Sequence, residues 1–239
     1  MTFSYEKIFY YKKMTYTLII PIYNEDRTLS LLLKKLDTLS SHNIEIIIID
    51  DGSTDGTEMT LKNHKKFNIL KNESNIGKGA SIRECIKSAT NQNIILMDGD
   101  LEIDIDNIPR LINEFEKSNN DIVIGKRWGN KDPLSFEINR IGNYFINTLF
   151  NLLYKTNFKD ILCCVRILDT KLIKSLDLQS KGFSIEVETI AKLVLRGSII
   201  KEMKVHYNRR TFREGKKLKI SDGWSIIWTA IKIKFFTKL

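Results

Sequence analysis

The stretch Ile94-Ile95-Leu96-Met97-Asp98-Gly99-Asp100 decides how this chain of 239 residues folds. Four apolar residues in a row predict a buried strand, and the two carboxylates then stand where that strand ends. In open α/β sheets, ligands bind at the carboxyl ends of the strands. Two neighbouring carboxylates repel each other unless a cation or proton joins them. The pair therefore indicates a divalent cation such as Mg²⁺ or Mn²⁺, while a plain Asp-Gly turn remains the alternative.

Apolar runs and helical patterns alternate along the first half of the chain. Leucines recur at helical spacing between the first two apolar runs, at Leu29, Leu32, Leu33 and Leu36. Such alternation predicts an α/β fold with a mainly parallel, Rossmann-like sheet and helices on both faces. The predicted strands are residues 17–22, 44–49, 67–70, 94–97 and 122–124.

Polar clusters follow four of these predicted strands, and parallel strands would bring them to one edge of the sheet. Asp50 and Asp51 follow the second strand and are predicted to accept hydrogen bonds from a nucleoside, with a turn and helix cap as the alternative. Lys78 stands between Gly77 and Gly79 at a predicted helix start, which suits an anion, although a simple glycine turn would give the same pattern.

Composition narrows the class of protein. The three cysteines give no disulfide framework or paired metal motif, and a reducing cytoplasm is expected. Residues 1–14 lack the apolar core of a signal peptide, and no apolar stretch is long enough for a membrane span. The whole excess of nine positive charges lies in residues 196–239. A basic segment of this kind usually faces a nucleic acid or a membrane surface.

Taken together, the strand-end motifs resemble glycosyltransferase family 2, whose members have the GT-A fold and use nucleotide-sugar donors. The resemblance extends over roughly residues 15–225 and is closest to the dolichyl-phosphate mannosyltransferase and polyprenyl-phosphate glycosyltransferase branch. Its motifs in this chain are Ile20-Pro21-Ile22-Tyr23-Asn24-Glu25, Asp50-Asp51-Gly52-Ser53, Asn75-Ile76-Gly77-Lys78-Gly79, Asp98-Gly99-Asp100, Gly125-Lys126-Arg127, Gly182-Phe183-Ser184-Ile185-Glu186 and Arg213-Glu214-Gly215-Lys216-Lys217.

The resemblance implies a role for each matched position. The metal, Mg²⁺ or Mn²⁺, is expected on Asp98, Asp100 and Glu102, although the family often has Gln where Glu102 stands. Arg127 and Arg140 are expected to hold the phosphate of a lipid acceptor, and Asp160 and Glu186 to face the sugar or acceptor. The catalytic set is thus Asp100, Arg127, Arg140, Asp160 and Glu186, and the nucleotide-sugar set is Pro21, Tyr23, Glu25, Asp50, Asp51, Lys78, Asp98, Arg213 and Lys217.

The expected reaction moves a hexose from a nucleoside diphosphate sugar, of the GDP-mannose or UDP-glucose type, to a polyprenyl or dolichyl phosphate with inversion. A phosphate is largely ionised at neutral pH, so it attacks without a strong general base. One alternative is a saccharide or protein acceptor, for which Asp160 or Glu186 would act as the base. A second alternative is a non-catalytic protein that binds nucleic acid through its basic segment.

The same pattern suggests how the chain is organised and where it acts. We expect an N-terminal extension over residues 1–14, a GT-A domain over residues 15–219 and a basic amphipathic helix over residues 220–239. Tryptophan and lysine beside an apolar face are typical of a helix lying in a bilayer interface. The leading prediction is a cytoplasmic protein, peripheral on the cytoplasmic membrane face or held there by a partner membrane protein, that does not bind nucleic acid.

Overall fold

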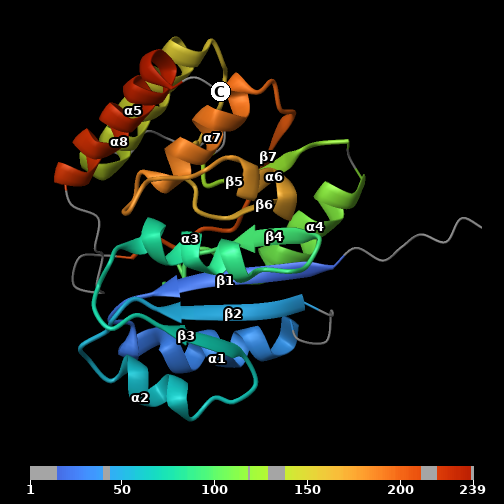
Figure 1. Ribbon diagram of the computed structural model, residues 1–239, viewed down its shortest axis with the longest axis vertical. Helices are drawn as coiled ribbons and strands as arrows, with labels where there is room; N and C mark the ends of the chain where they lie inside the picture. The colour runs from blue at the N-terminus through green and yellow to red at the C-terminus, as the bar shows by residue number, and fades with distance from the viewer. Residues whose placement is uncertain (1–14, 40–43, 118, 129–137, 211–219, 238–239) are drawn as a thin grey trace, which may run out of the picture.

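The computed structural model describes residues 15–39, 44–117, 119–128, 138–210 and 220–237, and there it forms one seven-stranded sheet packed between helices (Figure 1). The strands are β1 (Tyr16–Ile22), β2 (Ile44–Asp50), β3 (Asn68–Lys71), β4 (Asn93–Leu96), β5 (Ile122–Lys126), β6 (Arg166–Asp169) and β7 (Ile200–Lys204). The helices are α1 (Asp26–Leu39), α2 (Thr57–Lys62), α3 (Lys78–Ser88), α4 (Asn107–Lys117), α5 (Ile138–Tyr154), α6 (Thr170–Ser175), α7 (Ile185–Leu195) and α8 (Ile220–Phe236).

The sheet has the order β3-β2-β1-β4-β6-β5-β7, and only β6 runs antiparallel to its neighbours β4 and β5. The predicted mainly parallel sheet with helices on both faces is confirmed, and all five predicted strands are present within a few residues. Sequence patterning missed β6 and β7. The short β6 begins with Arg166, a cation that is buried because it donates hydrogen bonds to three backbone carbonyls. The half-exposed β7 has no continuous apolar run.

Two apolar cores lie on opposite faces of the sheet. One contains the buried leucines of α1 together with apolar residues of α2 and α4. The other contains apolar residues of α3, α5, α6, α7 and α8. Helix α7 is buried along nearly its whole length because α5 and α8 pack outside it. Isoleucine runs such as the one in β2 suit this arrangement, since both faces of the strand are covered.

Two glycines fix the loops at the carboxyl edge of the sheet. Gly52 has φ +70°, and a Cβ there would lie 2.4 Å from the carbonyl carbon of Ser74. Gly77 has φ +97°, and a Cβ there would lie 2.5 Å from the carbonyl oxygen of Lys181. Glycine alone meets both demands without strain. The backbones of the loops after β2 and β3 therefore approach neighbouring backbone closely at these two positions, although several side chains of both loops are exposed.

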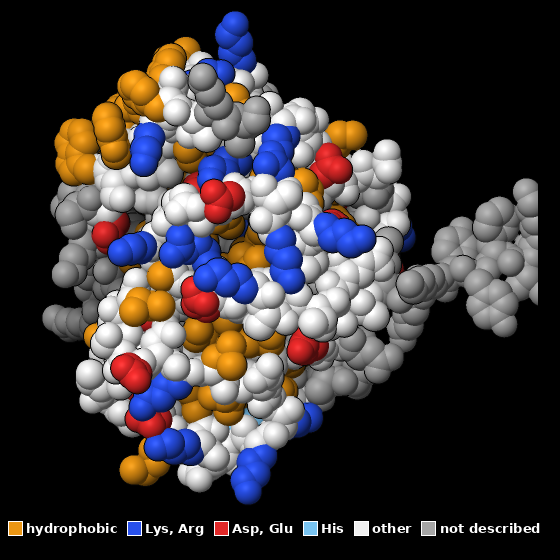
Figure 2. Space-filling model, viewed as in Figure 1, with side chains coloured by type: hydrophobic (Ala, Val, Ile, Leu, Met, Phe, Trp, Pro, Cys, Tyr) orange, Lys and Arg blue, Asp and Glu red, His pale blue; other side chains and the backbone are white. Residues whose placement is uncertain are grey.

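Helices α5 and α8 lie side by side at the outer end of the molecule (Figure 1). Ile226, Ala230 and Ile233 of α8 are buried, whereas Trp224 and Trp228 are 73% and 60% exposed. Hydrophobic side chains gather on the surface where these helices lie (Figure 2). No helix in the described ranges is both long enough and apolar enough to cross a membrane.

Candidate active site

Lys78 is the cation that joins the strand-end aspartate to a second helix. Its Nζ lies 2.7 Å from Asp98 Oδ1 and 2.6 Å from Glu186 Oε1. Burial alone would lower the pKa of Lys78, but Asp98 and Glu186 together raise it. Lys78 therefore stays protonated. The predicted donor residue Lys78, the predicted metal ligand Asp98 and the predicted acceptor-side Glu186 form one contiguous group.

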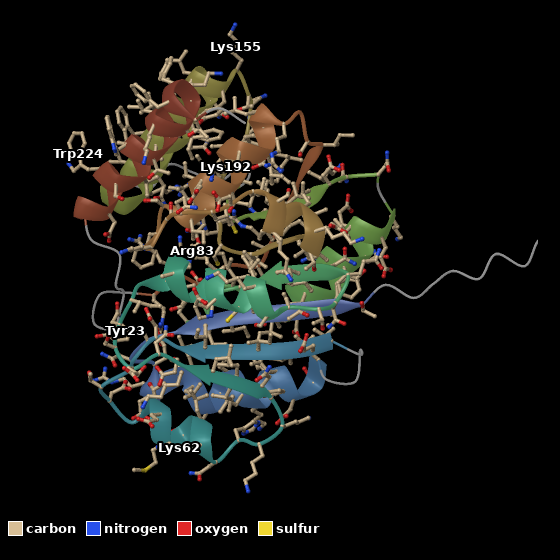
Figure 3. The ribbon with its side chains drawn as sticks, viewed as in Figure 1. Tyr23, Lys62, Arg83, Lys155, Lys192 and Trp224 are labelled. Atoms are coloured by element: carbon tan, nitrogen blue, oxygen red, sulfur yellow. The ribbon has the colours of Figure 1, made fainter. Side chains whose placement is uncertain are left out.

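The position of Lys78 depends on a loop held by α7. The carboxylate of Glu188 accepts the backbone N–H groups of Gln179 and Ser180 at 2.8 and 2.7 Å, and pairs with Lys192 Nζ at 2.8 Å. The carbonyl of Lys181 in this loop accepts the backbone N–H of Ala80 at 3.0 Å. This chain of contacts fixes the start of α3, where Lys78 stands. Lys192 is labelled in Figure 3.

Asp100 is a carboxylate whose ionised form is disfavoured by its surroundings. Burial, the charge of Asp98 and the charge of Glu102 raise the pKa of Asp100 to about 7. In the part of the chain that the structure describes, no three acidic, histidine or cysteine side chains enclose a metal position. Mg²⁺ and Mn²⁺ commonly take one or two carboxylates and complete their shell with substrate phosphates and water. The oxygen donors Asp98 and Asp100 fit such an ion, and Glu102 stays a predicted ligand.

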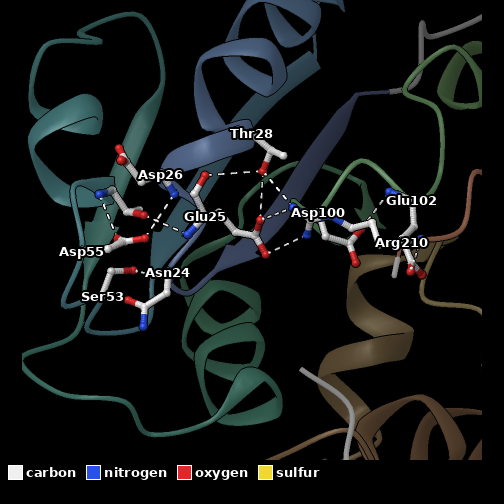
Figure 4. A network of polar contacts seen from close by, with 10 residues as sticks. Asn24, Glu25, Asp26, Thr28, Ser53, Asp55, Asp100, Glu102 and Arg210 are labelled. Atoms are coloured by element: carbon white, nitrogen blue, oxygen red, sulfur yellow. Dashed lines mark hydrogen bonds and ion pairs between the residues drawn. The ribbon is translucent and has the colours of Figure 1, made fainter. Parts of the chain in front are cut away.

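A strap over residues 205–210 closes the acidic side of the site. Its backbone pairs with the segment after β4, with Ile103 bridged to Tyr207 and the N–H of Asn208 bonded 2.7 Å from the carbonyl oxygen of Glu102. The backbone N–H of Arg210 donates to Glu102 Oε1 at 3.0 Å. Its guanidinium donates to both oxygens of Glu25 at 3.1 and 2.9 Å (Figure 4). Sequence reasoning missed Arg210, because nothing distinguishes it from the other arginines of that basic segment.

The two aspartates at the end of β2, Asp50 in the strand and Asp51 directly after it, have different environments. Asp51 accepts hydrogen bonds from the side chain of Asn72 and from the backbone N–H groups of Ile76 and Gly77, so it shapes the loop before Lys78. Asp50 is only 1% exposed; Oδ1 accepts the Ser53 N–H, whereas buried Oδ2 has no hydrogen-bond partner among the described residues. An unpartnered buried carboxylate oxygen is costly, which favours a ligand donor there.

The predicted Pro21 and Tyr23 lie at the same edge of the sheet. Pro21 is in β1, opposite Ile49 of β2. Tyr23 follows the end of β1 and is half-buried, on the side of the molecule toward which β1 points (Figure 3). Both residues are therefore close in the chain to Glu25 and lie beside the end of β2, where Asp50 stands.

Arg127 and Asp160 form a buried bidentate pair at the end of β5. Nε and Nη2 of Arg127 each lie 2.8 Å from one Asp160 oxygen, and the backbone N–H of Arg127 donates to the same carboxylate. Burial opposes the charge, but Asp160 raises the pKa of Arg127 well above its usual value. Within the described chain, Nη1 of Arg127 has no hydrogen-bond partner. The pair therefore fixes the guanidinium while leaving donors for an anion.

Aromatic rings connect Arg127 with Arg140. The guanidinium of Arg127 lies 5.5 Å from the ring centres of Trp128 and Tyr207, and that of Arg140 lies 4.8 Å from the centre of Trp128. Tyr207 and Trp128 meet edge to face at 5.2 Å. Both predicted acceptor arginines thus belong to one cluster, and the two rings were not foreseen from the sequence. The other predicted basic residues, Arg213 and Lys217, lie outside the described residues.

This α/β sheet has carboxylates, a buried unpartnered aspartate oxygen and cations at its carboxyl edge, which is where open α/β sheets bind their ligands. The family model for glycosyl transferase family 2 matches residues 17–176. The chain belongs to this family and is a glycosyltransferase, as its motifs predicted.

Two relatives indicate the branch. The chain is 28% identical over 233 residues to a dodecaprenyl-phosphate galacturonate synthase of Rhizobium johnstonii, covering 93% of this chain and 67% of the relative. It is 29% identical over 186 residues to the glycosyltransferase AglJ of Haloferax volcanii, covering 75% of this chain and 58% of that protein. The predicted likeness to polyprenyl-phosphate glycosyltransferases is confirmed.

Solved structures confirm the GT-A fold. The glucosyl-3-phosphoglycerate synthase of Mycobacterium tuberculosis, in complex with Mn²⁺, UDP and phosphoglyceric acid, aligns with a TM-score of 0.75 at 16% identity. The alignment covers 95% of this chain and 80% of the synthase. A complex of the same synthase holds Mg²⁺ and UDP and also gives a TM-score of 0.75.

Proposed function

We propose that this protein transfers a hexose from a nucleoside diphosphate sugar to a polyprenyl phosphate, inverting the anomeric centre. The observation that carries the proposal is the opposite charge of the two ends of its site. Carboxylates gather around Asp98 and Asp100 at one end, whereas at the other the cations Arg127 and Arg140 gather around the rings of Trp128 and Tyr207, and Tyr207 lies between the two groups. An acidic end that takes a cation and a basic end that takes a phosphate suit this pair of substrates.

At the donor end, the residues divide into those that bind and those that position. Asp50 would accept a hydrogen bond from the nucleoside through its unpartnered oxygen, beside Pro21 and Tyr23. Mg²⁺ or Mn²⁺, held by Asp98 and Asp100, would neutralise the charge that develops on the leaving diphosphate. Lys78 adds a fixed positive charge within the same group.

At the acceptor end, the arginines would orient the attacking phosphate. Asp160 locks the guanidinium of Arg127, which saves the entropy of ordering it when the acceptor binds. Arg140 stacks on Trp128 and would approach the same phosphate from α5. Their charge offsets the repulsion between the lipid phosphate and the donor diphosphate.

The state of the two candidate bases also supports a phosphate acceptor. Both oxygens of Asp160 are engaged by Arg127, and Glu186 is paired with Lys78. A hydroxyl acceptor needs a carboxylate that is free to accept a proton. A phosphate acceptor does not, because it is already ionised.

The lipid would be reached from the bilayer surface. The exposed aromatic residues of α5 and α8 include Tyr144, Phe145, Trp224, Trp228 and Phe235. Trp224 and Tyr23 lie on the same side of the molecule (Figure 3). An aromatic face flanked by lysines suits shallow insertion at the level of the lipid headgroups. Such docking would turn the strand ends toward the membrane, on its cytoplasmic face.

The proposal is tested with the purified protein in two stages. A thermal-shift screen of GDP and UDP, each with and without Mn²⁺, should show stabilisation by one nucleotide that increases with the metal. Labelled nucleotide sugars are then incubated with a short polyprenyl phosphate, and a labelled lipid product is expected. Absence of any nucleotide response contradicts the transferase, whereas labelling of a saccharide but not of the lipid contradicts the acceptor.

A further inference from the structure

The geometry points to Arg210 as the resident counter-cation of the donor site, a positioning residue that keeps divalent metal binding weak until the donor diphosphate arrives. This inference rests on the proposed function, because it concerns the order in which metal and nucleotide enter that site. Arg210 lies outside every motif of the family resemblance, and it contacts two separate segments of the site, residues 25–28 and Glu102.

The contacts of Arg210 span the acidic end of the site. Its guanidinium makes a bidentate pair with Glu25 and donates to the Thr28 hydroxyl at 3.2 Å, while its backbone N–H binds Glu102. Thr28 also donates to Glu25 Oε2 at 2.9 Å, so the carboxylate is held from two sides. Figure 4 shows Arg210 extending to Glu25 with Asp100 and Glu102 nearby.

The burial of this pair makes it electrostatically effective. The side chains of Arg210 and Glu25 are only 13% and 7% exposed. The pKa of Arg210 is raised by Glu25 first and then by Asp100 and Glu102, against the opposing effect of burial. A single guanidinium therefore compensates carboxylates of both the nucleoside side and the metal side.

A fixed positive charge beside these carboxylates has two opposite effects on ligands. It repels an incoming divalent cation, and it offsets the repulsion between the acidic cluster and an incoming diphosphate. A diphosphate brings negative charge that outweighs the repulsion felt by the metal. The two ligands therefore enter together, and neither binds tightly alone.

The test measures Mn²⁺ and UDP or GDP binding to the chain of 239 residues by calorimetry at a fixed pH. Arg210→Gln should bind Mn²⁺ about tenfold tighter without nucleotide, or about 1.4 kcal/mol. The same variant should bind the nucleotide about tenfold weaker without metal. Arg196→Gln, which removes an equal charge at the far end of α7, serves as the control and should match wild type.

Two further variants separate charge from shape. Arg210→Lys keeps the charge and should retain most of the wild-type Mn²⁺ affinity. In Glu25→Gln/Arg210→Gln the paired charges are lost together, so its Mn²⁺ affinity should return toward wild type. A merely structural role predicts that Arg210→Gln weakens both ligands, and that result overturns the inference, as does unchanged Mn²⁺ binding. If wild type binds no nucleotide with Mn²⁺, the proposed function fails as well.

Discussion

The donor end and the acceptor end of the site differ in the balance of their charged side chains. At the donor end, the carboxylates of Glu25, Asp98, Asp100, Glu102 and Glu186 outnumber the two described cations that contact them, Lys78 and Arg210. At the acceptor end, Arg127 has its own carboxylate, Asp160, and Arg140 adds a second cation. Among the described residues, the guanidinium of Arg127 is thus paired with its own carboxylate, whereas the donor carboxylates share fewer cations than their own number.

The largest expected effect follows from removing a carboxylate that is proposed to hold the metal. Asp100→Asn should lower turnover by roughly 10²–10³-fold, because the charge that holds the metal against the diphosphate is lost. Asp106→Asn, an exposed acid on the following turn, is the matched control and should retain activity. Product formation is measured by lipid extraction. Turnover near that of wild type in Asp100→Asn contradicts the metal role of this carboxylate.

The same variant, Asp100→Asn, should increase the free energy of unfolding of the metal-free protein at neutral pH, although it lowers turnover. The pKa of Asp100 is raised to about 7 in the folded protein, so the folded state holds a proton that the unfolded state has released. The free energy of unfolding of the metal-free protein should therefore fall as the pH rises from about 4 to about 7. Asp100→Asn should lack that fall. Urea unfolding at several pH values measures it.

The acceptor end is more sensitive to the loss of a single partner. Asp160→Asn leaves the buried Arg127 without its only acidic partner among the described residues and should lower the free energy of unfolding by about 3 kcal/mol. Glu25→Gln should lower it by only about 1 kcal/mol, because Asp100 and Glu102 still face Arg210. Chemical denaturation compares them. Equal losses would remove the distinction between the two ends.

Acceptor use provides a kinetic test of the same comparison. Arg140→Ala should raise the KM for polyprenyl phosphate about tenfold and leave the KM for the nucleotide sugar unchanged, since one charge-assisted contact is removed. Arg196→Gln again controls for net charge. If Arg140→Ala instead weakens binding of the nucleotide sugar and leaves the KM for polyprenyl phosphate unchanged, the acceptor role of Arg140 is contradicted.

The smallest expected effect concerns the membrane face. Trp224→Ala should weaken binding to anionic vesicles about threefold, because one of several aromatic anchors is lost. Met59→Ala is the control, since Met59 is equally exposed at 73% but lies on α2, away from α5 and α8. Vesicle sedimentation measures both. Equal binding of the two variants contradicts insertion through α8.

The sequence predicted the elements that depend on local patterns, and it missed the features that depend on contacts between distant segments. The run of isoleucines in β2 and the leucine stripe of α1 reveal themselves locally, because burial on one or both faces dictates them. Strand β6 could not be predicted because it begins with Arg166, a charged residue that is buried. Its guanidinium donates to the carbonyls of Cys163 and Glu186, and no periodic pattern of side chains reveals these contacts. The contacts of Arg210 with Glu25 and of Trp128 with Tyr207 join segments far apart in the sequence, so no local pattern predicts them.

The sequence by itself determined the alternating strand and helix order, the family and the acidic residues at the end of β4, because these depend on local periodicity and short motifs. Only the tertiary structure decided which cation neutralises which carboxylate. The insertion of antiparallel β6 between β4 and β5 separates the donor end from the acceptor end. Lys78 pairs with Glu186 and Arg210 with Glu25 across 108 and 185 positions of chain, because the folded sheet brings these segments to one edge.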